Sequence, residues 1–246
     1  MKIKIAIVDS RISSEAEKKL TLSGYKVITL PPFSRLSEAV ASHPDMLIRK
    51  IGNEYISYAD YCEEASYIFS DLSLFSVGTG ARFTFTADEV GATYPSDVGL
   101  NALEIGGKLF CREASASESM LESARHAGLE IVNVKQGYPA CTVLKLNDRA
   151  AITADAGMAK ILTKHGIRVT LIEPGDISLP PHEYGFIGGA GEVDSGKLFF
   201  FGDPVLHHDG DKIIEAATSE GLSIVPLSSC GLIDLGGILF AEGNID

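Results

Sequence analysis

Apolar and polar residues follow one another along the chain in a pattern that predicts a recurring pair of elements, an amphipathic helix and then a short apolar strand. In each copy, apolar residues recur at helical spacing, a glycine follows, and a run of Val, Ile and Leu comes next. Glycine suits the junction because it adopts the left-handed backbone conformation that ends a helix without steric cost. The four copies are residues 15–30, 118–134, 157–172 and 211–227, with Gly24, Gly128, Gly166 and Gly221 at their junctions.

A second landmark follows at a variable distance: an aromatic, His or Ser residue, then a small residue or proline, then an apolar segment. The landmarks begin at positions 43, 94, 138, 184 and 229, so successive steps are 51, 44, 46 and 45 residues. A near-constant step indicates an internal repeat. Short strands are predicted to begin near Met46, Val98, Thr142, Phe186 and Leu232.

A strand that ends in a polar residue precedes each helix, at residues 5–9, 109–111, 151–155 and 199–203. Residues 55–60 supply a fifth such strand, followed only by a short helical turn at 61–65, and residues 66–89 match the pattern poorly. The final strand, 238–241, has no helix after it, whereas residues 3–10 open the chain with the strand that completes this unit. Such an offset is typical of a closed ring of repeats.

We therefore predict an α/β fold in which residues 1–246 form a single domain of five imperfect ββαβ repeats, closed into a five-fold pseudosymmetric β/α propeller. The alternative is a doubly wound sheet, in which any alternation of strands and helices looks repetitive. That fold would not place a further strand after each turn, so the landmarks favour the ring. Any active site would then lie at its centre.

Composition and charge exclude several classes of function. The formal net charge is −12 and the 21 Lys and Arg residues are scattered, so no nucleic-acid surface is expected. The four cysteines form no CxxC pair, which indicates free thiols in a reducing compartment. Residues 1–9 predict a strand and not a signal peptide, and no apolar run reaches membrane-spanning length, so we expect a cytoplasmic protein without a membrane partner. No pattern specifies an oligomeric state.

Several segments carry a resemblance to a known group of proteins. They are residues 8–11 (VDSR), 43–45 (HPD), 135–138 (KQGY) with Cys141, 185–191 (GFIGGAG) and 234–237 (DLGG). Together with the repeated ββαβ unit, they resemble an uncharacterised bacterial family of the pentein fold. That fold is shared by guanidino-group-modifying enzymes, such as arginine deiminase and dimethylarginine dimethylaminohydrolase, and by a ribosome anti-association initiation factor.

The resemblance implies a site in the axial channel of the ring. The pentein enzymes place a cysteine nucleophile in the last repeat, a His one repeat earlier and acidic residues in the preceding repeats, so Cys230 is the nucleophile that the resemblance implies. The chain departs from the enzymes at two places. Residues 184–187 contain no His, and residues 139–141 lack the acidic signature of the third repeat.

The residues themselves add two candidates for catalysis, Cys141 and His43. Cys141 opens a predicted inner strand, where its thiol would face the channel, although a free cysteine is also a common small filler of the core. His43 forms the strongest His–carboxylate pair with Asp45, because Pro44 constrains the turn between them. The alternative is an ordinary turn in which Asp45 caps backbone N–H groups and His43 is exposed.

Acidic and amide side chains of the inner strands would make the channel suitable for a cationic or amino-bearing small molecule. The candidates for binding it are Asp45, Asp97, Asn101, Asp155 and Asp234. Asp155 ends a strand just before a helix, where capping of the helix is the default role. The alternative for the whole set is dispersed, solvated charge.

No cofactor or metal is predicted. Residues 186–191 are glycine-rich, but a strand follows them where a nucleotide-binding loop requires a helix, so we interpret these glycines as positions of close backbone approach. His207, His208 and Asp209 more simply begin a helix, because adjacent histidines seldom bind one ion together.

Two hypotheses for function follow. The first is a cysteine-dependent hydrolase or transferase that acts on a guanidine, amidine or amino-acid-like molecule, with Cys141 or Cys230 as nucleophile and His43 as acid and base. The second is a non-catalytic pentein that binds a protein or small-molecule partner. An open acidic pocket that contains a cysteine would favour the first hypothesis, and a plugged channel with a broad apolar patch the second.

Overall fold

The computed structural model describes residues 2–75 and 79–244, which form a mixed α/β fold built on small sheets. Five three-stranded sheets share one arrangement, in which the middle strand pairs antiparallel with one neighbour and parallel with the other. They are β17–β1–β2 (Leu239–Asn244, Lys2–Asp9, Tyr25–Leu30), β3–β4–β5 (Ile48–Ile51, Glu54–Tyr58, Arg82–Thr86), β6–β7–β8 (Leu103–Ile105, Lys108–Cys111, Glu130–Asn133), β9–β10–β11 (Val143–Asn147, Ala150–Thr153, Arg168–Leu171) and β13–β14–β15 (Gly191–Asp194, Lys197–Phe200, Ser223–Pro226).

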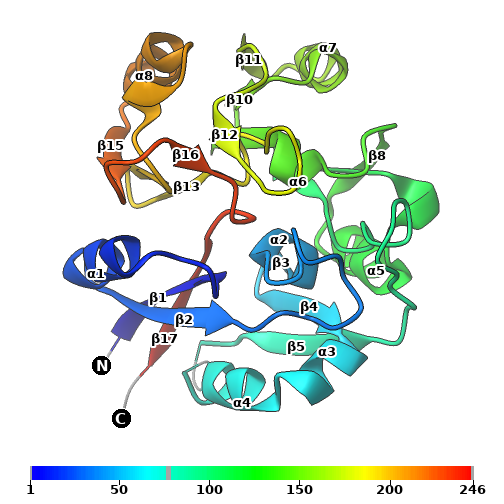
Figure 1. Cartoon of the computed structure of the whole chain (residues 1–246). Coiled ribbons are helices and arrows are strands. Elements are labelled where there is room, and N and C mark those ends of the chain that lie inside the picture. The colour runs from blue at the N-terminus through cyan, green and yellow to red at the C-terminus, as the bar shows by residue number, and fades with distance from the viewer. Residues whose placement is uncertain (1, 76–78, 245–246) are drawn as a thin grey trace.

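One or two helices connect the parallel pair of every sheet. They are α1 (Ser14–Leu22), α3 (Ala59–Glu64) with α4 (Ser66–Phe75), α5 (Glu118–His126), α7 (Ala156–Lys164) and α8 (Gly210–Ser219). Figure 1 shows α1, α4, α5, α7 and α8 on the outside of the molecule, around the sheets. The four predicted helix–glycine–strand junctions are present, and their glycines have φ values between 75° and 93°.

The core lies between these outer helices and the sheets. Leu20 of α1, Leu162 of α7 and Ile213 of α8 are fully buried. Each helix therefore stabilises its own unit by about 1.5–3 kcal/mol per buried side chain of this size. Among the described residues, no helix is long and apolar enough to cross a membrane.

The segment 66–89, which matched the predicted pattern poorly, completes a regular unit. It contains α4 and β5, and β5 pairs parallel with β4 as in the other sheets. The sequence pattern missed this unit, although α4 buries Ile68, Phe69 and Leu72 and exposes Ser66, Ser70 and Asp71. In the sequence, Val77 stands two positions after this helix, where the other four helices have a glycine.

The inner strands begin later than predicted. Met46 lies in the short helix α2 (Pro44–Leu47) and Thr142 in α6 (Pro139–Thr142), and the strands β3 and β9 follow directly. Proline at the first position of a helix favours such a turn, because its φ is already helical and it lacks only an N–H that would be unpaired. Leu232 belongs to β16 (Leu232–Ile233), which pairs with β12 (Ile177–Ser178), so the inner strand of that unit is β17.

Candidate active site

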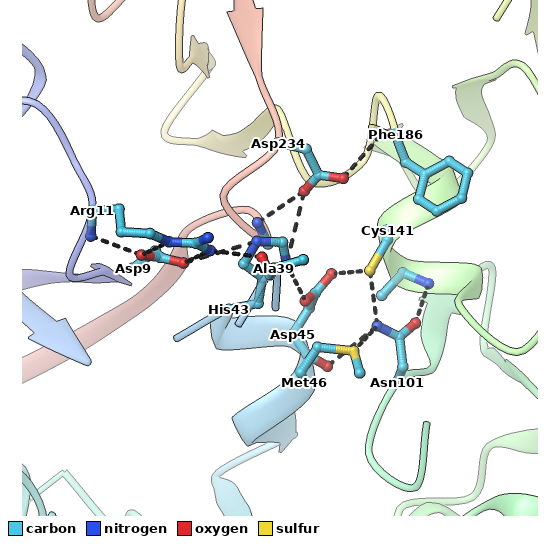
Figure 2. Close-up of polar contacts among 12 residues, drawn as sticks. Asp9, Arg11, Ala39, His43, Asp45, Met46, Asn101, Cys141, Phe186 and Asp234 are labelled. Carbon is cyan, nitrogen blue, oxygen red and sulfur yellow. Dashed lines mark hydrogen bonds and ion pairs between the residues drawn. The ribbon is translucent and has the colours of Figure 1, made fainter. Parts of the chain in front are cut away.

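Two short helices bring a cysteine and a carboxylate together near the middle of the molecule. Asp45 lies in α2 and Cys141 in α6, and the Sγ of Cys141 donates a hydrogen bond to Asp45 Oδ2 at 2.7 Å. Figure 2 shows the two side chains pointing toward each other. Cys141 is buried and Asp45 is mostly buried, and the two residues lie 96 positions apart in the sequence.

Asn101 supports this pair from a third unit. Its Nδ2 donates to Cys141 Sγ at 3.1 Å and lies 3.4 Å from Met46 Sδ. Its Oδ1 accepts a hydrogen bond from the backbone N–H of Ala140 at 2.9 Å, which fixes the orientation of the amide. An N–H that points at the sulfur stabilises a thiolate more than a thiol.

His43 lies at the N-terminus of α2, surrounded by carboxylates. Its Nδ1 is 3.9 Å from Asp45 Oδ1 and 3.9 Å from Asp234 Oδ1, and its Nε2 is 3.8 Å from Asp9 Oδ2. These distances are longer than hydrogen bonds, and neither ring nitrogen has a partner among the described residues. Burial lowers the pKa of His43 to about 4, so the imidazole is neutral at pH 7.

The surroundings of Asp45 and Cys141 favour the protonated form of each side chain. Burial, with the charge of Asp234, raises the pKa of Asp45 to about 7. Burial also raises the pKa of Cys141 well above its usual range, and the charges of Asp45 and Asp234 raise it further. Without a bound cation, Cys141 is therefore a thiol that shares its proton with a carboxylate.

Asp234 follows β16 in a loop where the backbones crowd closely. It accepts hydrogen bonds from the N–H groups of Phe186 (2.9 Å) and Gly236 (3.1 Å). A Cβ atom on Gly189 would lie 1.8 Å from Asp234 Oδ1, and one on Gly188 would lie 2.2 Å from a backbone oxygen of α6. The glycine-rich segment is thus a place of close backbone approach, as predicted.

Asp9 and Arg11 border the cluster, and the candidate residues from the sequence did not include them. Asp9 ends β1 and is fully buried, and the Arg11 guanidinium donates to its carboxylate, with Nε 2.9 Å from Oδ1. That bond raises the pKa of Arg11. In the sequence, the only indication that these two residues belong to a site is the family resemblance of residues 8–11. Its position at a strand end before a helix otherwise indicates that Asp9 caps the helix.

A cavity of about 670 Å³ opens onto this cluster. His43, Cys141 and Asp234 line it, together with Asp97 and Tyr138. The Tyr138 hydroxyl donates to Asp97 Oδ2 at 2.6 Å. Six of the predicted residues therefore belong to one site. His43, Asp97, Cys141 and Asp234 line the cavity, and Asp45 and Asn101 hydrogen-bond to the Cys141 thiol.

Two predicted site residues, Cys230 and Asp155, lie away from this cavity. Cys230 is exposed and does not line the cavity, and its carbonyl accepts from the N–H of Asp203 at 2.8 Å. Asp155 caps α7, because its Oδ1 accepts from the N–H of Met158 at 2.9 Å, and it borders a separate, smaller hollow. The chain turns after β15 so that Asp234, and not Cys230, reaches the site.

Asp176, His207 and His208 form the one described group with spacing that could hold a metal ion. Local hydrogen bonds account for its geometry. Asp176 Oδ2 accepts from the backbone N–H of His208 at 3.0 Å, and His207 Nδ1 accepts from the N–H of Asp209 at 3.0 Å. These contacts order the turn before α8, as expected for residues that begin a helix.

Comparison with solved structures shows that the chain has the pentein fold. The chain is similar to SxtG, an amidinotransferase from Microseira wollei in the saxitoxin biosynthetic pathway (15% identity, 90% of this chain and 79% of that chain, TM-score 0.55). It is also similar to dimethylarginine dimethylaminohydrolase from Pseudomonas aeruginosa, in a mutant complexed with citrulline (11% identity, 91% and 90%, TM-score 0.55), and to C. jejuni agmatine deiminase (10%, 90% and 74%, TM-score 0.51). The resemblance to the penteins that the sequence indicated is therefore confirmed.

The chain belongs to a family of unknown function, DUF6873, whose model matches residues 7–239. Comparison with the sequences of curated proteins yields no match.

Proposed function

We propose that this protein is a cysteine-dependent hydrolase or transferase that acts on the guanidino or amidino carbon of a small cationic molecule, with Cys141 as the nucleophile. The observation that carries this proposal is the 2.7 Å hydrogen bond from Cys141 to Asp45 beside a cavity walled by further carboxylates. We also propose that the five ββαβ units are one domain of residues 1–246, arranged as a five-fold pseudosymmetric ring about that cavity.

A cationic substrate would activate the thiol. Asp45 and Asp234 raise the pKa of Cys141, and a guanidinium bound between them offsets their charge and so lowers that pKa. Cys141 then passes its proton to Asp45, whose pKa of about 7 suits proton exchange near neutral pH. The Asn101 amide stabilises the resulting thiolate.

The sulfur attacks the amidino carbon, so that a C–S bond forms and the C–N bond to the leaving amine breaks. The leaving amine takes the proton from Asp45. Water or an amine acceptor then attacks the same carbon, and its proton passes through neutral His43 or Asp45 to the sulfur as the C–S bond breaks. Water gives hydrolysis and an amine gives amidino transfer.

The nucleophile in this proposal lies in a different unit from the one that the pentein resemblance implied. In a pseudosymmetric ring, equivalent positions of all units face the same axis, so a cysteine in one unit and a His in another can meet there. Asp45 lies beside both residues: its Oδ2 accepts from Cys141 Sγ at 2.7 Å, and its Oδ1 lies 3.9 Å from His43 Nδ1. A cavity that contains a cysteine is also what the enzymatic hypothesis predicted, in contrast to the non-catalytic one.

A thiol-reactive amidine tests the proposal. With 2-chloroacetamidine, we expect Cys141 to be alkylated at least tenfold faster than exposed Cys230, although Cys141 is buried. With neutral 2-chloroacetamide, which has nearly the same shape, Cys141 should lose this advantage, because the amide carries no charge for Asp45 and Asp234 to bind. Slow and equal labelling of all four cysteines by both reagents would refute the proposal.

A further inference from the structure

Apart from two histidines, the acidic and basic side chains that line the cavity are all carboxylates. Its carboxylates are Glu38, Asp97, Glu183 and Asp234, and no Lys or Arg stands among the described residues that line it. Glu38 and Glu183 are exposed at the rim, whereas Asp97 and Asp234 are buried. A ligand with a carboxylate would therefore meet repulsion and find no counter-charge.

Asp97 lines the cavity and has a carboxylate oxygen available to accept a hydrogen bond from a ligand. It is 4% exposed, and its Oδ2 accepts from Tyr138, but its Oδ1 is buried with no hydrogen-bond partner among the described residues. A buried carboxylate oxygen without a donor is costly, and a bound N–H group would supply one. Asp97 thus offers a second cation-binding position besides the Asp45 and Asp234 pair.

Two basic side chains, Arg11 and Arg112, contact residues of the cavity wall, and both are already engaged. Arg11 donates to Asp9 and, through Nη2, to the carbonyl of Ala39 at 2.9 Å. Arg112 lies over the ring of Tyr94, 5.2 Å from its centroid, and donates to Ser115 Oγ at 3.1 Å. Neither lines the cavity, so a substrate carboxylate has no guanidinium to bind there.

Three aromatic rings form an apolar surface in the cavity, against which the middle of a ligand can pack. The rings of Tyr94 and Tyr138 lie 5.8 Å apart, and those of Tyr138 and Phe186 lie 6.5 Å apart. All three line the cavity, and Tyr138 directly precedes the helix that carries Cys141. A short methylene chain packs well on such a wall, with a cationic group at each end.

We infer that the substrate is a guanidine or amidine that carries a second cationic group on an apolar spacer and no carboxylate. This inference rests on the proposed function and narrows its substrate class from cationic molecules in general. The guanidinium would lie by Cys141, and the second cation by Asp97 and the rim carboxylates.

Three guanidines with matched chains test the inference: agmatine, with a terminal amine; butylguanidine, with no terminal charge; and L-arginine, with an added carboxylate. Each is used to protect Cys141 of the purified protein against alkylation by 2-chloroacetamidine. We expect agmatine to protect at a concentration at least tenfold lower than arginine, with butylguanidine between them. Arginine protecting as well as agmatine, or no protection by any of the three, would overturn the inference.

The proposed function fails separately, because it requires Cys141 to be labelled preferentially before any competitor is added. Three variants locate the second cation. Asp97→Asn should reduce the preference for agmatine over butylguanidine at least tenfold, and Glu183→Gln at the exposed rim about twofold. Glu63→Gln, on the outer helix α3, is the control and should leave the preference unchanged. An unchanged preference in both Asp97→Asn and Glu183→Gln would also overturn the inference.

Discussion

Replacing Asp45 with Asn removes a carboxylate whose Oδ2 lies 2.7 Å from Cys141 Sγ and keeps the size of the side chain. The carboxylate raises the pKa of the thiol through its charge and by accepting its proton. Asn101 still donates to the sulfur in the D45N variant and stabilises a thiolate. The thiol of D45N should therefore ionise at lower pH than that of the wild type.

The size of the effect follows from the separation of the two charges. Unit charges about 4 Å apart interact by about 4 kcal/mol at an effective dielectric constant of about 20. Asp45 has a pKa of about 7, so it carries most of its charge at pH 8.5. Burial, which Asn does not relieve, remains the largest cause of the raised thiol pKa. Since about 1.4 kcal/mol corresponds to a tenfold change, about 4 kcal/mol corresponds to several hundred-fold, and we expect about a 100- to 1,000-fold gain in thiolate at pH 8.5.

Alkylation by iodoacetamide at pH 8.5, with each cysteine quantified by mass spectrometry, measures this gain. Exposed Cys230 is an internal reference whose rate should not change. Asp211→Asn, on the exposed side of α8, is the matched control and should change neither rate. Labelling of Cys141 that is equal or slower in D45N would refute the assignment of Asp45 as the group that holds the thiol proton.

Two further predictions concern stability. Burial raises the pKa of Glu192 from 4.5 to about 7, so the contribution of this side chain to stability is fully present below pH 4.5 and is lost as the pH rises through 7. In urea unfolding, the free energy of unfolding of Glu192→Gln should therefore rise by about 1–3 kcal/mol relative to that of the wild type between pH 4.5 and 8. A difference that stays constant with pH would contradict this. A Cβ on Gly189 would lie 1.8 Å from Asp234 Oδ1, so Gly189→Ala should destabilise the protein by about 1–3 kcal/mol and reduce the preferential labelling of Cys141. Gly231→Ala, where a Cβ meets no atom within 4 Å, should stay within about 0.5 kcal/mol of wild type in the same unfolding experiment.

The repeat was predictable because its signals are local. A helix that ends in glycine and continues into an apolar strand is visible in any short window of sequence, and four of the five units have it. The unit of α4 and β5 was missed because Val77 stands where the other four helices are followed by a glycine. A local pattern identifies a unit only where such a boundary signal is present.

The site was only partly predictable, because it depends on which loops meet. His43 and Asp45 are neighbours in sequence, and Cys141 and Asp234 could be placed on inner segments from the repeat alone. Whether Cys141 or Cys230 reaches the centre depends on the path of the chain after β15, and the pattern of apolar residues does not specify that path. The bond from Tyr138 to Asp97 joins residues 41 positions apart and has no local signal.

The antiparallel pairing of β1 with β17 has a consequence for synthesis on the ribosome. Ile7 pairs with Leu239, so about 230 residues are added between the two partners. At about 5–20 residues per second, the first strand waits roughly 10 to 50 s with one edge unpaired. An unpaired strand edge invites aggregation, and charged side chains on it are a common protection. Lys2 and Lys4 alternate with Ile3 and Ile5 along this edge, so they would keep the nascent strand from pairing with other chains until β17 arrives.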